Sequence, residues 1–165
     1  MANGSAFIWS PSVRRLLIFL ALFSFAGVAS AHPALIPFPS TVKWLDGQVP
    51  IGAGTVVDGR GKAASTASYL ARVLGLSASI GGHSRIELAL VPASKIANPE
   101  GYHLRASGNE VQIEASDPRG LFYGAQTLRQ LLTVKSGSRT VPAVEIDDTP
   151  RFQWRGRSEE RRVGK

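Results

Sequence analysis

The sequence has 165 residues, 44% of them hydrophobic, no cysteine, and a formal net charge of +7. Much of that charge lies at the two ends, because residues 32–156 hold 13 basic and 10 acidic side chains, a net charge of +3. The composition excludes disulfides, thiolate metal sites and cysteine nucleophiles. No basic stripe with interleaved aromatic residues is present, which argues against nucleic-acid binding. Residues 32–156 suffice for one domain, whereas a complete barrel enzyme needs about 250 residues.

Residues 1–31 are predicted to be a signal peptide. Two arginines at positions 14 and 15 precede an apolar run over residues 16–28. That run has the length of a signal h-region and is short for a membrane span of about 20 residues. Small residues at its end predict cleavage before His32. The alternatives are an uncleaved anchor and twin-arginine rather than Sec export. We expect an exported bacterial protein, periplasmic or extracellular, with no stable membrane anchor.

The first half of the mature chain predicts short strands and one helix. Apolar runs and alternation predict strands over residues 41–45, 48–51, 55–57 and 86–91. An Asp46-Gly47 turn is expected to end the first of these strands. Small and apolar residues at spacings of three and four predict a helix over residues 63–74, which Gly75 would end.

The second half predicts a hairpin, a second helix and a last strand. Residues 102–106 and 110–115 alternate and flank Ser107-Gly108-Asn109. We expect the core to contain Tyr102, Leu104, Val111 and Ile113, and the wet side to contain His103 and Arg105 opposite Glu110, Gln112 or Glu114. An Asp117-Pro118 start predicts a helix over residues 118–132. Its expected buried stripe is Leu121, Ala125, Leu128 and Leu132, and the last strand is expected over residues 141–146. Together these elements predict an α/β (α+β) layer with helices on one sheet face.

Patterns for metal or nucleophilic chemistry are missing from the sequence. His32, His83 and His103 have no metal-ligand spacing, and neither H-E-x-x-H nor G-x-S-x-G occurs. We therefore predict no metal site and no cofactor. The adjacent Asp147 and Asp148 would point apart on an extended chain, which favours a turn or capping role over a catalytic pair.

Four strings of residues resemble the N-terminal domain of glycoside hydrolase family 20, the β-N-acetylhexosaminidases. They are I-P-F-P at 36–39, N-P-E-G-Y-H-L at 98–104, G-L-F-Y-G-A-Q-T-L-R-Q-L-L at 120–132 and D-T-P-R-F-Q-W-R-G at 148–156. The resemblance covers nearly all of residues 32–156. The third string is specific because its polar Gln and Thr, on an otherwise apolar helix, are not needed for packing.

The resemblance implies a fold and a reaction. In the family this domain is an antiparallel sheet with two helices on one face, it carries no catalytic residue, and it precedes a (β/α)8 barrel. Residues 32–149 would be that domain, and residues 150–156 would be the start of a barrel that is almost wholly missing. In the barrel an Asp orients the substrate's 2-acetamido group, which attacks the anomeric carbon, and the adjacent Glu is general acid and then base.

One functional position carries over from the family. Arg155 matches the arginine that hydrogen-bonds hydroxyls of the terminal sugar, and a guanidinium fork suits a vicinal diol. The alternative is a solvated charge at a frayed end. No Asp-Glu dipeptide occurs in the sequence, so we assign no catalytic residue to this chain.

Residues 157–165 depart from the family, because the barrel strand should continue as an apolar run. We interpret them as an artefactual tail that resembles a translated sequencing adapter; a genuine charged tail is the alternative. The whole sequence then predicts an inactive N-terminal fragment of an exported β-N-acetylhexosaminidase. The parent would act on terminal N-acetylhexosamine of glycans or chitin oligomers by a retaining mechanism. A stand-alone carbohydrate-binding or scaffold module is the alternative. A third possibility, another N-acetylglucosaminidase family with a similar leading domain, is opposed by the P-R-F-x-W-R-G string.

Overall fold

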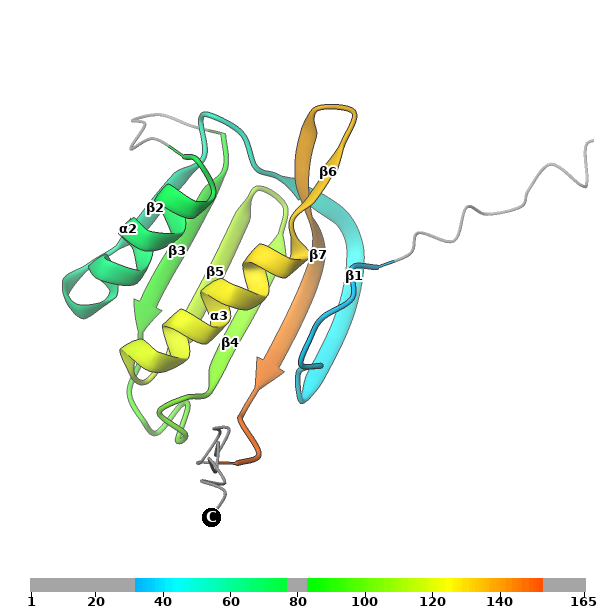
Figure 1. The fold of residues 1–165 in the computed structure, drawn as a ribbon. Coiled ribbons are helices and arrows are strands. Elements are labelled where there is room, and N and C mark those ends of the chain that lie inside the picture. The colour runs from blue at the N-terminus through cyan, green and yellow to red at the C-terminus, as the bar shows by residue number, and fades with distance from the viewer. Residues whose placement is uncertain (1–31, 77–82, 153–165) are drawn as a thin grey trace, which may run out of the picture. The chain divides into compact units, whose positions relative to one another are not determined.

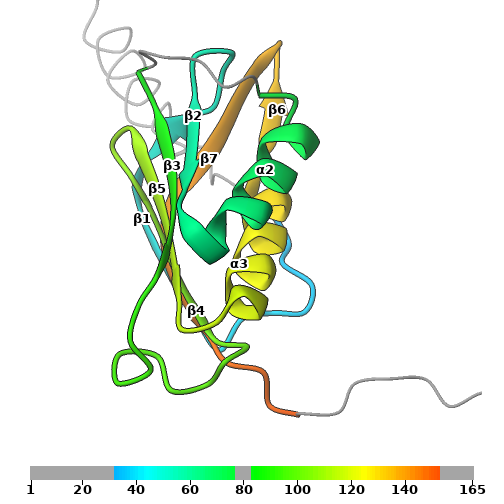
Figure 2. The same cartoon turned by 90° about the vertical axis from the view of Figure 1, so that its left-hand side faces the viewer.

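A seven-stranded sheet and two helices make up the residues that the structure, a computed structural model, describes: 32–76 and 83–152 (Figure 1). The elements in chain order are β1 (Thr41–Pro50), β2 (Val56–Gly59), a short 3-10 helix (Gly61–Ala63), α2 (Ala64–Val73), β3 (Arg85–Leu90), β4 (Tyr102–Ser107), β5 (Glu110–Ala115), α3 (Pro118–Leu131), β6 (Thr133–Lys135) and β7 (Ser138–Asp148). Both helices lie on the same face of the sheet (Figure 2). The predicted fold class is therefore confirmed.

The sheet has the strand order β1-β7-β4-β5-β3-β2, with β6 paired to β7. The pairs β1–β7, β7–β4 and β4–β5 are antiparallel, as expected. At the other edge β2 pairs parallel to β3, and β3 pairs parallel to β5, which corrects the expectation of a wholly antiparallel sheet. The cause of the first parallel pair is α2, because a helical crossover returns the chain to start its next strand in the same direction.

The hairpin of β4 and β5 has the predicted buried and solvent-exposed faces, and the structure gives its register. Leu104 lies opposite Ile113, and both are fully buried. His103 lies opposite Glu114 and Arg105 opposite Gln112, on the side that no helix covers. Strict alternation therefore specifies both the pairing and the buried face, because a shift by one residue would bring the charged set into the core.

The predicted turn at Asp46-Gly47 is wrong, because β1 continues through it. β7 pairs with β1 on both sides of the dipeptide, and the register shifts between Trp44 and Gln48. The dipeptide thus lies in a β-bulge, where Gly47 has a φ of +106°. Opposite the bulge Ala143 and Val144 are adjacent and both buried, so the inward-facing set of β7 changes phase there.

Gly75 terminates helix α2, as predicted, and the last helical residue is Val73. The Gly75 N–H donates to the Arg72 carbonyl at 3.1 Å, and the Leu76 N–H donates to the Ala71 carbonyl at 2.8 Å. Gly75 has a φ of +61°, so the end is a Schellman motif. The guanidinium of Arg139 on β7 adds a further donor, to the Leu74 carbonyl.

Helix α3 begins at the predicted cap, since the Asp117 carboxylate accepts a hydrogen bond from the Arg119 N–H at 3.0 Å. The hydrogen bond from the Arg119 guanidinium holds the pKa of Asp117 below its usual range. The buried stripe is confirmed except at Leu132. The helix ends one residue earlier, so Leu131 is fully buried and Leu132 leads into β6. The three-residue β6 is an element that the sequence pattern does not predict.

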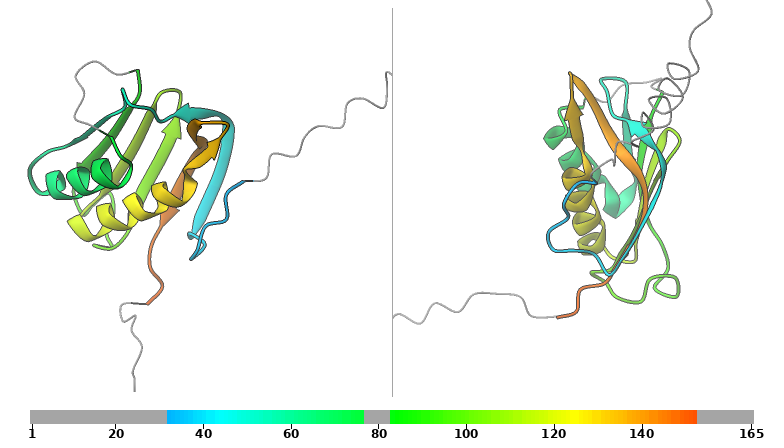
Figure 3. Two further views of the ribbon diagram at one scale, coloured as in Figure 1. Left: turned by 45° about the horizontal axis from the view of Figure 1, so that its top comes forward. Right: turned by 90° about the vertical axis from the view of Figure 1, so that its right-hand side faces the viewer.

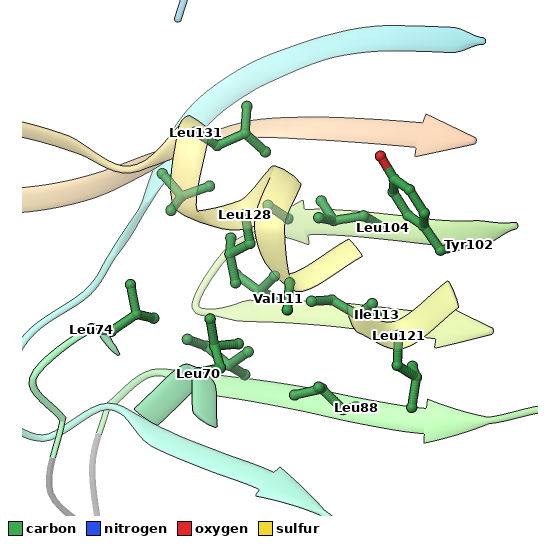
Figure 4. Packing of buried hydrophobic residues seen from close by; sticks show 14 of the residues in the cluster. Leu70, Leu74, Leu88, Tyr102, Leu104, Val111, Ile113, Leu121, Leu128 and Leu131 are labelled. Atoms are coloured by element: carbon green, nitrogen blue, oxygen red, sulfur yellow. The ribbon is translucent and has the colours of Figure 1, made fainter. Parts of the chain in front are cut away.

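The core lies between the sheet and the two helices (Figure 4). Leu70 of α2 and Leu121, Leu128 and Leu131 of α3 are at most 1% exposed. They pack on the covered face of β3, β4 and β5. Burying a side chain of this size stabilises the fold by about 1.5–3 kcal/mol, so these four contribute a large share of the stability.

Candidate functional site

The contact between α3 and the sheet depends on two glycines of the G-L-F-Y-G string. A Cβ on Gly120 would lie 2.2 Å from the Gly101 carbonyl oxygen and 2.8 Å from the Ala115 Cβ. A Cβ on Gly124 would lie 2.5 Å from the Ile113 Cγ2. The helix backbone therefore rests directly on β4 and β5, at a distance that no larger residue permits.

The polar residues of the same string have structural partners, which corrects the view that they are not needed for packing. The Thr127 hydroxyl lies 2.6 Å from the buried Tyr102 hydroxyl. Gln126 donates to the Tyr69 hydroxyl of α2 at 3.1 Å, and this bond lowers the pKa of Tyr69. These side chains tie α3 to β4 and α2. Their partners lie 25 and 57 positions away in the sequence, so no local pattern indicated them.

Gln130, at the end of the string, holds residues 32–40, which we call the N-terminal segment. Its side-chain amide accepts the Ile36 N–H at 2.8 Å and donates to the Ile36 carbonyl at 3.0 Å. The segment therefore lies alongside α3, on the helix side of the sheet (Figure 3). Leu35 and Pro39 are buried, whereas Ile36 and Phe38 are 77% and 72% exposed.

The chain leaves the described domain beside this N-terminal segment, through residues 149–152, which we call the exit segment. A hollow of about 610 Å³ lies between the two segments, lined by residues 37–40 and 148–152. A second hollow of about 590 Å³ is lined by residues 97–100, Arg119, Pro150 and Phe152. Phe152 lines both hollows, and its side chain is 70% exposed. We call the residues that line these two hollows the rim, and the side of the sheet that carries α2 and α3 the helix side. The rim and the helix side carry exposed apolar side chains, so they form a candidate docking surface.

The carboxylates of Asp147 and Asp148 point apart, as predicted for neighbours on a strand. Asp147 Oδ1 lies 2.8 Å from His103 Nδ1, on the face without helices. Asp148 Oδ1 accepts hydrogen bonds from the backbone and hydroxyl of Ser40. The two carboxylates thus do not converge on one bond, as a catalytic pair must.

The face of the sheet without helices, which we call the open face, is covered by charge pairs. Arg85 pairs with Asp58 at 2.6 Å, and Lys95 pairs with Glu114 at 2.6 Å. His103 adds its contact to Asp147, and its Nε2 lies 4.0 Å from Glu145. Among the residues that the structure describes, this face therefore presents charged side chains that are partly exposed to solvent.

Other predicted positions lie apart from one another or outside the described residues. His32 stacks on Trp44 with ring centroids 4.0 Å apart, and His83 is exposed. Within residues 32–76 and 83–152 no cluster of three or more His, Asp or Glu is placed to hold a metal ion. In that same part of the chain no helix is long and apolar enough to cross a membrane. The signal peptide, Arg155 and the tail fall outside the described residues.

Comparisons with known proteins agree with this fold. Residues 32–149 match the family described as glycosyl hydrolase family 20, domain 2. A β-hexosaminidase of Vibrio furnissii is 29% identical over 129 residues, which are 77% of this chain and 21% of that protein. The solved structure of a glycoside hydrolase family 20 β-N-acetylglucosaminidase is 34% identical with a TM-score of 0.62, over 74% of this chain and 24% of that one. N-acetyl-β-hexosaminidase of Streptomyces plicatus is 33% identical with a TM-score of 0.59, over 76% and 28%.

The chain spans a quarter or less of the length of the curated relatives that it matches. The family match extends over most of the described residues, and the glycine contacts and polar ties of α3 fall within it. This chain belongs to glycosyl hydrolase family 20, and its residues 32–149 form domain 2 of that family.

Proposed function

We propose that this chain is the leading part of an exported β-N-acetylhexosaminidase. Its folded domain would support a catalytic barrel that begins at residues 150–156. The observation that carries the proposal is the match of residues 32–149 to domain 2 of the family, in relatives of which this chain covers a quarter or less. The signal-like residues 1–31 support export.

The whole enzyme would remove terminal N-acetylhexosamine from glycans or chitin oligomers. The names of the relatives, an N-acetylglucosaminidase and an N-acetyl-β-hexosaminidase, support this substrate class. The acetamido oxygen of the substrate would attack its own anomeric carbon while a glutamic acid protonates the leaving oxygen, which breaks the glycosidic bond and forms a cyclic intermediate. Water, deprotonated by the same glutamate, would then attack the anomeric carbon and reopen the ring, and the two inversions give net retention. This chain has no Asp-Glu dipeptide, so we propose that it is inactive alone. Arg155 would hydrogen-bond hydroxyls of the terminal sugar.

The domain's contribution would be a surface for the barrel. The exposed apolar side chains on the helix side and the rim include Ile36, Phe38, Phe122 and Phe152. The open face carries ion pairs instead. A catalytic domain that follows residue 152 would cover the apolar side, since burying those side chains stabilises an interface.

The test compares the 165-residue chain with a longer protein from the same gene, read through residue 156 in frame. We expect hydrolysis of an aryl N-acetyl-β-glucosaminide by the longer protein only. In the longer protein, Arg155→Gln should lower kcat/KM by about 10- to 100-fold, as expected for lost hydrogen bonds to a charged group. Turnover by the 165-residue chain would contradict the proposed inactivity. A longer protein without hexosaminidase activity, or specific glycan binding by the 165-residue chain, would favour the stand-alone module.

A further inference from the structure

The exit segment is tied to the N-terminal segment through one serine. The Ser40 N–H donates to Asp148 Oδ1 at 3.0 Å, and the Ser40 hydroxyl lies 3.0 Å from the same oxygen. That hydroxyl also accepts the Thr149 N–H at 3.3 Å. A hydroxyl has one proton and two lone pairs, so it donates to the carboxylate and accepts from the backbone at the same time.

The opposite side of the exit segment is bounded by backbone. A Cβ on Gly101 would lie 3.2 Å from Thr149 Oγ1 and 3.3 Å from the Asp148 carbonyl oxygen. The loop before β4 therefore touches residues 148–149, while Ser40 holds the same residues through hydrogen bonds. Ser40 therefore contacts residues 148–149 from one side, and Gly101 contacts them from the other.

The carboxylate of Asp148 is also linked to the core. The pKa of Tyr102 is raised, first by burial and further by the charge of Asp148, which lies opposite it in the ladder between β4 and β7. The Tyr102 hydroxyl in turn lies 2.6 Å from Thr127 of α3. Asp148 thus lies beside a buried tyrosine that is hydrogen-bonded to α3.

These bonds hold residues beyond the paired part of the edge strand. The ladder between β1 and β7 already ends at Thr41 opposite Asp147, so closing the ladder does not require a bond to Thr149. We propose that Ser40 and Asp148 are positioning residues that set the direction of the exit segment and thereby seat the domain that follows. The seating part of this inference rests on the proposed function; the part about the exit segment does not.

The first test uses trypsin cleavage after Arg151 in the 165-residue chain, followed by mass spectrometry of the fragment that ends there. Ser40→Ala and Asp148→Asn should each raise the cleavage rate about tenfold, because proteolysis follows the population of the locally open state. Asp147→Asn, the neighbouring carboxylate on the other face, is the matched control and should leave the rate unchanged. Ser40→Thr retains the hydroxyl and should restore the slow rate.

Thermal unfolding of the same variants separates positioning from a general loss of stability. We expect cleavage after Arg151 to accelerate more than cleavage within β4 and α3. Equal acceleration at all sites, no acceleration in Ser40→Ala and Asp148→Asn, or the same acceleration in Asp147→Asn would each overturn the inference.

The second test uses the longer protein and the same four variants in a hexosaminidase assay. Ser40→Ala and Asp148→Asn should lower kcat/KM at least about threefold while Asp147→Asn and Ser40→Thr match the wild type. If the wild-type longer protein is inactive, the proposed function fails and the seating part fails with it, whereas the trypsin result still decides the exit segment. Wild-type kcat/KM in all variants of an active enzyme would overturn the seating part alone.

Discussion

The two faces of the sheet are built by different means. On the covered face, fully buried leucines and two glycines bring α3 against β4 and β5 at backbone distance. On the open face, charged side chains pair across strands while remaining partly in water, as Arg85 and Asp58 do at 47% and 29% side-chain exposure. Solvated pairs contribute little to stability, whereas a close-packed face tolerates few changes. The covered face therefore specifies the fold, whereas the charged pairs of the open face contribute little to it.

The largest expected effect is on the covered face. Gly120→Ala would place a methyl group 2.2 Å from the Gly101 carbonyl oxygen, and a backbone atom there has little room to move. We expect a loss of about 3 kcal/mol or more in the free energy of unfolding, measured by urea denaturation. Gly52→Ala is the control, since nothing lies within 4 Å of its added Cβ. Equal stability of the two variants would break the contrast between the faces.

A smaller effect is expected at the buried hydroxyl pair. Tyr102→Phe removes the bond to Thr127 and should lower the free energy of unfolding by about 1–2 kcal/mol at pH 7, measured by urea denaturation.

Burial raises the pKa of Tyr102 above the value of about 10 that it has in the unfolded chain. The unfolded state therefore loses its proton first, and stability should fall as the pH rises above about 10. Tyr102→Phe should reduce that alkaline loss. If the variant lost stability between about pH 9 and 11 as steeply as the wild type, Tyr102 would not be the group responsible.

On the open face we expect almost no change. Asp58→Asn removes the partner of Arg85 and should alter the free energy of unfolding by less than about 0.5 kcal/mol. The difference from wild type should shrink further in about 1 M salt, because exposed pairs are screened. A loss above about 1.5 kcal/mol at either salt concentration would show that the two faces are less different than their burial indicates.

The apolar side chains on the helix side should affect association rather than folding. We expect the 165-residue chain to be poorly soluble or oligomeric, because Phe38 and Phe122 are exposed by 72% and 42%. The double variant Phe38→Ser with Phe122→Gln should shift the chain toward monomer in light scattering and leave its unfolding midpoint nearly unchanged. A monomeric wild-type chain would contradict the expectation. Lys43→Ser with Lys95→Gln, two substitutions of exposed polar side chains, is the control and should leave the association unchanged.

Local patterns predicted the elements whose determinants lie close together in the sequence. The alternation of residues 102–115 and the Asp117-Pro118 start placed the hairpin and α3 within a residue or two. The Asp46-Gly47 dipeptide suits a turn and a bulge equally, so pairing with β7 decided between them. Parallel pairing at the β2 edge was missed because strand direction depends on how α2 crosses the sheet.

The candidate surface was less accessible to sequence reasoning. The divergence of Asp147 and Asp148 could be read from the sequence, whereas the close contacts of Gly120 and Gly124 came from the structure. The bonds of Ser40 and Gln130 could not, because their partners lie 108 and 94 positions away. Ser40 is a serine after a proline, and Gln130 is a glutamine on a helix surface. Neither feature is unusual in isolation. Their role arises only when the sheet brings the two segments together.

The side-chain amide of Gln130 imitates a peptide group. Its oxygen accepts a hydrogen bond from the Ile36 N–H, and its nitrogen donates one to the Ile36 carbonyl oxygen. Chemical ageing would break that symmetry. Deamidation converts the nitrogen arm to an oxygen, which would then face a carbonyl oxygen that it cannot donate to. A single deamidation would thus replace the hydrogen bond to the Ile36 carbonyl with repulsion between two oxygen atoms. Long-stored preparations should therefore release residues 32–40 from α3 before the core is affected.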